Sequence, residues 1–254
     1  MKLKGLIYTG ISIVIFGIVI LVVGLFVPSF SLKNINFGYY ELIEYKYNYD
    51  EIDNISIDCE ADNIEIRYAY EYKDIKVICK DGDNISYDVV LNTNTSTLSI
   101  EQNLKPSLRI NLGYSINDPL IIEVPALVQL SYDISCEVGE VLIDDGYIKS
   151  CSIDMAVGTL DINNSNISDL DINIEVGEIN TNELFLTNGN IDLICGSCIL
   201  NINPVLLLDV KVSVGSIKMD LELDEEYYTI NNTGNGYIKV NAEVELGKVK
   251  YIWD

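Results

Sequence analysis

Six glycines recur at a fixed interval of 19 residues in the second half of this 254-residue chain. They are Gly139, Gly158, Gly177, Gly196, Gly215 and Gly234. The local motif is Val-Gly-x-apolar, as in Val157-Gly158-Thr159-Leu160. Because the whole chain has only 17 glycines, a ladder of this length indicates a repeat architecture.

Apolar residues alternate within each copy, which indicates strands with one buried face. Cys151, Ile153, Met155 and Val157 are an example. A turn of about 19 residues accommodates two or three short strands joined by tight corners, and successive turns then pair in parallel, about 4.8 Å apart. Glycine suits one corner because it has no Cβ, and the Asn or Asp found five residues after it favours another. We therefore expect an all-β fold, a parallel β-solenoid with turns of about 19 residues.

The remaining sequence divides around this repeat. We expect the solenoid over residues 126–240 and a C-terminal cap strand over 241–254, since the copy around Gly234 has polar residues in its apolar columns. Strand-like runs between residues 51 and 125 predict an N-terminal β region that caps the first turn. A separate small β domain is the alternative there. Residues 28–50 form a tyrosine-rich juxtamembrane linker.

Residues 5–27 are uncharged and apolar, and a helix of this length spans a hydrocarbon core of about 30 Å. Lys2 and Lys4 precede this segment and Pro28 follows it. The positive-inside rule then leaves residues 1–4 as a cytoplasmic tail and exports the rest. We expect a single-pass protein of the cell membrane with an extracellular C-terminal domain. A cleavable signal peptide is the alternative, although its apolar region is usually shorter.

The composition excludes several classes of function. The chain has no histidine, which rules out serine triads and zinc sites that depend on imidazole. Sixteen basic and 39 acidic residues give a net charge of -23, so we expect no nucleic-acid partner. No motif for a cofactor is present.

Four cysteines fall in apolar columns of the repeat and are predicted to be buried thiols. They are Cys136, Cys151, Cys195 and Cys198. Cys195-Gly196-Ser197-Cys198 also has the CxxC spacing of a redox pair or of half a metal site. Free cysteine packs as a small hydrophobe, so we favour core packing and leave disulfides open.

Acidic residues flank two of the glycines two turns apart. They are Glu137 and Glu140 beside Gly139, and Glu175 and Glu178 beside Gly177. Two turns span about 9.6 Å, near the carboxylate separation of an inverting glycosidase, which makes a polysaccharide-acting β-helix enzyme an alternative. Ala156 and Thr159 interrupt this line in the intervening turn, so we prefer a solvated outer face and assign no catalytic or metal-binding residues.

Two segments support a resemblance to a known family. Ile121-Ile122-Glu123-Val124-Pro125 is followed by a strand, by Val138-Gly139-Glu140-Val141 and by further copies of that motif. This pattern resembles the bacterial putative adhesin domains of unknown function, over roughly residues 50–250. The resemblance implies an exported, all-β, solenoid-like domain of the cell envelope, often behind one membrane helix. It brings no catalytic residues with it.

These observations favour a non-catalytic module for adhesion, interaction or scaffolding in the bacterial cell envelope. Its partners would be the membrane, through residues 5–27, and an envelope protein or a glycan. The outward columns beside the glycines would supply the contacts: Glu140, Thr159, Glu178, Ser197 and Ser216. An accessory role in envelope-stress sensing is the second hypothesis. Tyr68, Tyr70 and Tyr72 alternate and could form an aromatic strip for sugar stacking, or simply pack.

Overall fold

The computed structural model describes residues 40–82, 84–104, 118–203, 207–221 and 239–252. They belong to one compact unit, Phe37–Asp254. The segment 5–27, which the sequence predicts to span a membrane, lies outside them. Among the described residues, no helix has the length and apolarity needed to cross a membrane.

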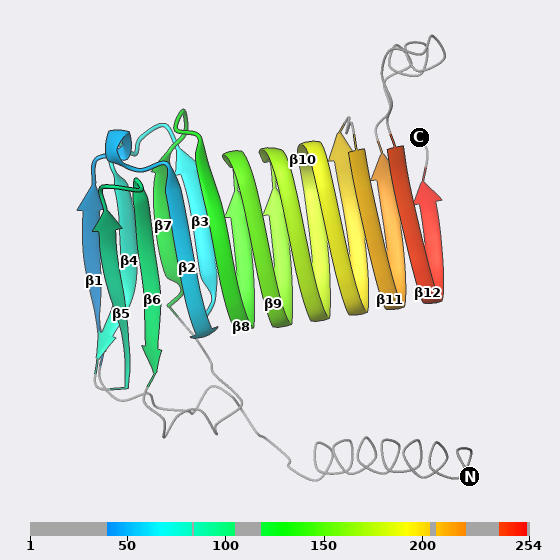
Figure 1. Cartoon of the computed structure of the whole chain (residues 1–254), viewed down its shortest axis with the longest axis horizontal. Coiled ribbons are helices and arrows are strands. Elements are labelled where there is room, and N and C mark those ends of the chain that lie inside the picture. Colours follow the sequence, from blue (N-terminus) through cyan, green and yellow to red (C-terminus); the bar gives the residue numbers. More distant parts are fainter. Residues whose placement is uncertain (1–39, 83, 105–117, 204–206, 222–238, 253–254) are drawn as a thin grey trace. The chain divides into compact units, whose positions relative to one another are not determined.

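The described residues form one sheet of twelve strands and a short 3-10 turn (Figure 1). The elements are β1 (Tyr40–Tyr47), η2 (Tyr49–Glu51), β2 (Asn54–Ala61), β3 (Ile64–Ala69), β4 (Ile75–Gly82), β5 (Ile85–Asn92), β6 (Thr97–Leu104), β7 (Leu120–Pro125), β8 (Leu130–Asp144), β9 (Tyr147–Asn163), β10 (Asn166–Asn203), β11 (Leu207–Leu221) and β12 (Lys239–Ile252). The all-β, solenoid-like architecture expected from the sequence is confirmed.

Strands β8 to β12 stack as parallel turns of a coil. Gly139 pairs with Gly158, Gly158 with Gly177, and Gly196 with Gly215. The 19-residue period therefore corresponds to one turn, and Figure 1 shows the successive turns of β8 to β12 stacked side by side. Inside the coil, equivalent apolar residues stack on one another. Ile134, Ile153, Ile172, Ile191 and Val210 are each at most 1% exposed.

The glycine corner leaves no room for a side chain. A Cβ built on Gly177 would overlap the backbone carbonyl oxygen of Gly158, and the same clash recurs along the coil. Gly196 and Gly215 also have φ values of 151° and 152°, which L side chains rarely adopt. Close backbone approach is thus the physical reason for the glycine ladder.

A second corner carries residues with positive φ at the same 19-residue interval. Asp145, Asn164 and Glu183 have φ values of 56°, 48° and 52°. Asp and Asn tolerate this left-handed conformation better than most residues. Backbone hydrogen bonds tie the corners together, because the Asp145 amide donates to the Asn163 carbonyl at 3.1 Å.

The last described turn differs from the predicted register. Gly215 of β11 pairs with Gly247 of β12, and Gly234 lies outside the described residues. The two paired glycines are 32 residues apart (247 − 215), 13 more than one turn. Residues 239–252, most of which were expected as a cap, therefore form another parallel turn.

The N-terminal strands continue the coil at its other end. β2 pairs in parallel with the first part of β8 and β3 with the second part, so that Ile57 lies beside Ile134 and Ile66 beside Ile143. β6 and β7 then stack on β2 and β3 in parallel. The antiparallel strands β5, β4 and β1 follow. Residues 40–47, expected within a linker, are thus strand β1 of the sheet.

Candidate interaction surfaces and a buried polar network

Asparagine and aspartate side chains form hydrogen-bonded ladders on the outside of the coil. In five pairs among the described residues, an Asn Nδ2 donates to the Asp Oδ1 one turn earlier, at 2.8–3.3 Å. The pairs are Asn163–Asp144, Asn173–Asp154, Asn180–Asp161, Asn188–Asp169 and Asn190–Asp171. Each bond holds two exposed or half-buried side chains in one geometry.

Two of these ladders border a groove of about 280 Å³. Asp169 and Asn188 stand on one side, and Asp171 and Asn190 on the other. Between these two walls, the floor of the groove is formed by the backbone of a column of buried residues: Tyr132, Cys151, Leu170 and Gly189. Ser150 and Ser152 continue the two walls into the preceding turn. We call this surface the ladder groove.

A neighbouring groove of about 220 Å³ contains two of the carboxylates singled out by sequence. Glu137 and Glu175 line it together with Asp154, and Ala156 lies between them in the coil. Glu140 and Glu178, which follow the glycine, are not part of it. Among the described residues, no group of three acidic or thiol side chains is placed to hold a metal ion.

The residues that precede the glycines form an exposed apolar ridge. Val138, Val157, Val176 and Val214 are each 40–47% exposed, and Cys195 in the same column is exposed. The prediction that Cys195 is a buried thiol is wrong. Inward positions on either side of the corner, such as Leu193 and Cys198, are five residues apart, so the alternation changes phase there.

The other three thiols of the repeat are buried. Burial raises the pKa of Cys151 and of Cys198 to about 12 and the pKa of Cys136 to about 11. These thiols stay protonated at neutral pH, which makes them poor nucleophiles. All six cysteines are unpaired, so the CxxC segment holds no disulfide.

At the first corner of the coil, aspartate takes the place of glycine. Asp62 follows β2, is fully buried, and its carbonyl oxygen faces Gly139 of the next turn. Lys80 Nζ of β4 lies 2.9 Å from Asp62 Oδ1 and 3.1 Å from Oδ2. The Tyr87 hydroxyl of β5 donates a short hydrogen bond to Oδ2. The Asn63 amide donates to Oδ1 at 2.8 Å.

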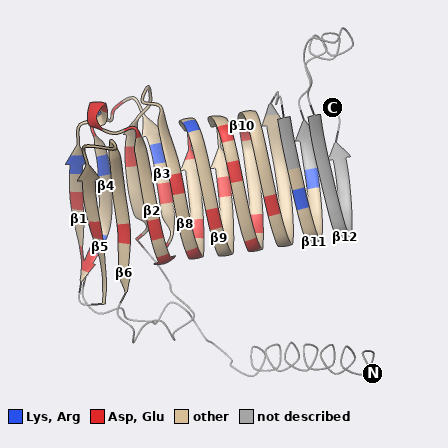
Figure 2. Ribbon diagram, viewed as in Figure 1, with Lys and Arg blue, Asp and Glu red and all other residues tan. Residues whose placement is uncertain are grey.

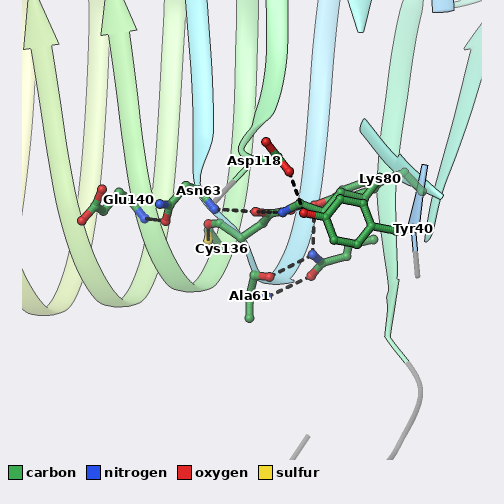
Figure 3. A network of polar contacts seen from close by, with 10 residues as sticks. Tyr40, Ala61, Asn63, Lys80, Asp118, Cys136 and Glu140 are labelled. Carbon is green, nitrogen blue, oxygen red and sulfur yellow. Dashed lines mark hydrogen bonds and ion pairs between the residues drawn. The ribbon is translucent and has the colours of Figure 1, made fainter. Parts of the chain in front are cut away.

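Gln102 of β6 connects this cluster to the backbone of Ala61, which Figure 3 shows in the same network of polar contacts as Lys80. Its Oε1 accepts from the Ala61 amide, and its Nε2 donates to the Ala61 carbonyl and to the Tyr87 hydroxyl, each at 2.9 Å. Burial raises the pKa of Asp62, although Lys80 and Tyr87 oppose this shift. Burial also raises the pKa of Tyr87 well above its ordinary value, so the phenol stays a donor. We call Asp62, Lys80, Tyr87 and Gln102 the corner network.

Comparison with protein families identifies the fold. The Toastrack DUF4097 family matches residues 52–251, which is most of the chain. The chain belongs to this family. No curated protein matches it.

Several solved structures are similar to this Toastrack chain, all with low sequence identity. A putative cell adhesion protein from Clostridium sporogenes is 15% identical, with a TM-score of 0.44, covering 85% of this chain and 99% of its own. A putative adhesin from Bacteroides fragilis is 14% identical, with a TM-score of 0.37, covering 84% and 97%. A putative lipid binding protein from Parabacteroides distasonis is 14% identical, with a TM-score of 0.29, covering 85% and 97%.

The predicted tyrosine strip does not form in the Toastrack fold. Tyr68 is buried in β3, where its hydroxyl lies 2.8 Å from that of Tyr132, whereas Tyr70 is 83% exposed. β3 ends at Ala69, so the alternation that joined Tyr68 to Tyr70 and Tyr72 stops at the turn. The alternative of a sugar-stacking strip at these three residues is therefore incorrect.

The corner network was missed by sequence reasoning. Asp62 and Lys80 lie outside the 19-residue repeat, so no periodic pattern relates one to the other. Lys80 shares the alternate positions of β4 with the half-buried Lys76 and Ile78, so strand alternation predicts an outward lysine and gives no signal for its burial.

Proposed function

We propose that this Toastrack chain is a non-catalytic adhesion or interaction module of the bacterial cell envelope. In this proposal residues 5–27 anchor the chain in the cell membrane and the coil stands on the outer side. The partner is a glycan or an envelope protein, and the ladder groove is the contact surface.

The observation that carries this proposal is the order of the polar groups along the ladder groove. Asn188–Asp169 and Asn190–Asp171 are bonded at 2.9 and 2.8 Å, so these side chains are held in place before a partner arrives. Preorganised polar groups lose less conformational entropy on binding than free ones. Serine hydroxyls, amides and carboxylates at intervals of about 4.8 Å suit a ligand that repeats hydroxyl or amide groups along its length.

The charge distribution narrows the class of partner. Acidic residues, red in Figure 2, are spread over β8, β9 and β10, whereas Lys211 and Lys218 belong to β11. With a net charge of -23, the chain repels polyanions at long range. A neutral or basic glycan or peptide therefore fits better than a teichoic-acid-like or nucleic-acid chain.

Binding of the full chain, reconstituted in lipid nanodiscs, to immobilised cell-surface glycan and protein fractions tests this function. The test variant is Asn188→Ala combined with Asn190→Ala, which removes the ladder donors of the groove. The matched control is Asn163→Ala combined with Asn180→Ala, which removes two ladder donors outside the groove. We expect the test variant to lose binding about tenfold, or about 1.4 kcal/mol, and the control to bind as the native chain does. Equal binding by both variants would remove the ladder groove from the function.

A further inference from the structure

The corner network holds an amine and a carboxyl group in contact in the interior of the protein. The Lys80 side chain is 5% exposed and that of Asp62 is not exposed at all. Replacing a buried ion pair by apolar residues is often neutral or stabilising, so ionic attraction alone is a weak reason for this arrangement. The pair also has a third group, the Tyr87 hydroxyl, bonded to one carboxylate oxygen.

We propose that Lys80 and Asp62 condense to an amide, so that an isopeptide cross-link joins β4 to the corner between β2 and β3. A modification of this kind needs no cofactor and no external reagent. Its reactants are the two side chains and its by-product is one water molecule.

The step balances in atoms and charge. One proton passes from the Lys80 ammonium to Asp62 Oδ1, which leaves a neutral amine and a neutral carboxylic acid. The Nζ lone pair attacks Cγ, and the new C–N bond forms while charge collects on Oδ2. A second proton then moves from Nζ to Oδ1, the Cγ–Oδ1 bond breaks, and Oδ1 leaves as water. The product is a neutral amide that keeps one hydrogen on Nζ, and Oδ2 becomes its carbonyl oxygen.

The geometry assigns a role to each neighbour of the pair. Oδ1, the leaving oxygen, is the carboxylate atom closer to Nζ, at 2.9 Å, so both protons have a direct path. Oδ2 accepts from the Tyr87 hydroxyl, which is a donor placed where negative charge develops. Gln102 Nε2 donates to the Tyr87 oxygen at 2.9 Å and orients that hydroxyl.

Burial favours the reaction in two ways. Desolvation penalises the charged pair relative to the neutral acid and amine, and the raised pKa of Asp62 has this same cause. Two reacting groups held in contact also have an effective concentration far above any in solution, in the range of about 10⁵–10⁸ M for well-oriented pairs. The amide product removes both buried charges.

The same chain contains a matched pair that should not react. Lys76 Nζ lies 3.0 Å from Glu123 Oε2, but the two side chains are 29% and 14% exposed. Lys76 remains accessible to water, and Glu123 raises the pKa of its ammonium, so the lysine stays protonated and is not a nucleophile. Proximity is similar in the two pairs, and Tyr72 approaches Glu123 as Tyr87 approaches Asp62, so burial is the feature that this comparison tests.

The experiment is the intact mass of the purified full chain, followed by peptide mapping. We expect the native chain to be lighter than its sequence by one water molecule, with a branched peptide that contains residues 62 and 80. Lys80→Arg keeps the positive charge but cannot form this amide, and is expected at its full sequence mass. Tyr87→Phe removes the donor to Oδ2 and is expected to form the cross-link about 10²-fold more slowly.

Either of two results overturns the proposal. One is a native chain at its full sequence mass after prolonged incubation, because Lys80 and Asp62 then form only an ion pair. The other is a loss of water that maps elsewhere, to Lys76 and Glu123 or to an Asp–Gly sequence such as Asp145-Gly146. Dehydration at Asp–Gly leaves linear peptides, so the branched peptide distinguishes the two reactions.

Discussion

Replacing Gly177 by alanine tests the reason for the glycine ladder. The added Cβ would overlap the backbone carbonyl oxygen and carbon of Gly158 in the preceding turn. Both contacts are with backbone, which cannot rotate away as a side chain does, so the two turns must separate. Overpacking of this kind costs about 1–3 kcal/mol, and a rigid backbone neighbour favours the upper end.

The substitution also changes the conformational entropy of the unfolded chain, which offsets part of this loss of stability. Alanine has less conformational freedom than glycine there, which stabilises the folded protein by about 0.4–1 kcal/mol. We therefore expect Gly177→Ala to lower the free energy of unfolding by about 2 kcal/mol. The whole free energy of unfolding of a domain is about 5–15 kcal/mol, so this loss is a large fraction of it.

Gly146→Ala is the matched control. Its Cβ would meet the Cδ1 atom of Ile148 at 2.9 Å and the Cγ2 atom of Ile143 at 3.2 Å. These are the ends of side chains, which can shift, so we expect a change of less than about 1 kcal/mol. The assay is urea unfolding of the full chain in detergent, followed by circular dichroism, with amide hydrogen exchange to locate the weakened turns. If Gly146→Ala destabilised the chain as much as Gly177→Ala, backbone contact would not be the cause of the ladder.

Three further predictions concern burial, exposure and titration. In intact cells a membrane-impermeant maleimide should label Cys195, the exposed cysteine of the six, and Cys195→Ser should abolish the labelling. If the native chain is not labelled, the coil does not lie on the outer side of the cell membrane. Ile172→Ala should lower the free energy of unfolding in urea by about 2–5 kcal/mol, because Ile172 is fully buried. Ile199 is 42% exposed, so Ile199→Ala should change that free energy by less than about 0.5 kcal/mol. Equal losses in the two variants would contradict the assignment of Ile172 to the buried face. The hydrogen bond from the Tyr40 hydroxyl to Asp118 raises the pKa of Tyr40 to about 12, so its stabilisation is complete below about pH 10 and is lost as the pH rises toward 12. Ultraviolet titration of Asp118→Asn should bring the Tyr40 pKa closer to 10, and no change would assign the shift to another cause.

Local and periodic features of this protein could be predicted from its sequence. The turn length, the glycine corner and the second corner each depend on a few neighbouring residues, and they recur along the coil at the glycines from Gly139 to Gly215 and at Asp145, Asn164 and Glu183. Inward columns such as Ile153, Ile172 and Ile191 follow from the same period, because equivalent residues of stacked turns must share one environment. Periodicity thus converts a local pattern into a tertiary one.

Features that do not follow from the 19-residue period could be determined only from the tertiary structure. Cys195 faces outward because the glycine corner changes the phase of the strand alternation, so the residue before each glycine is exposed although its column is apolar. Gly247 takes the place expected for Gly234 because 13 additional residues (32 − 19) come between it and Gly215. Asp62 and Lys80 meet because strands β2 and β4 belong to the non-repeating end of the coil, where stacking in space is set by the whole sheet.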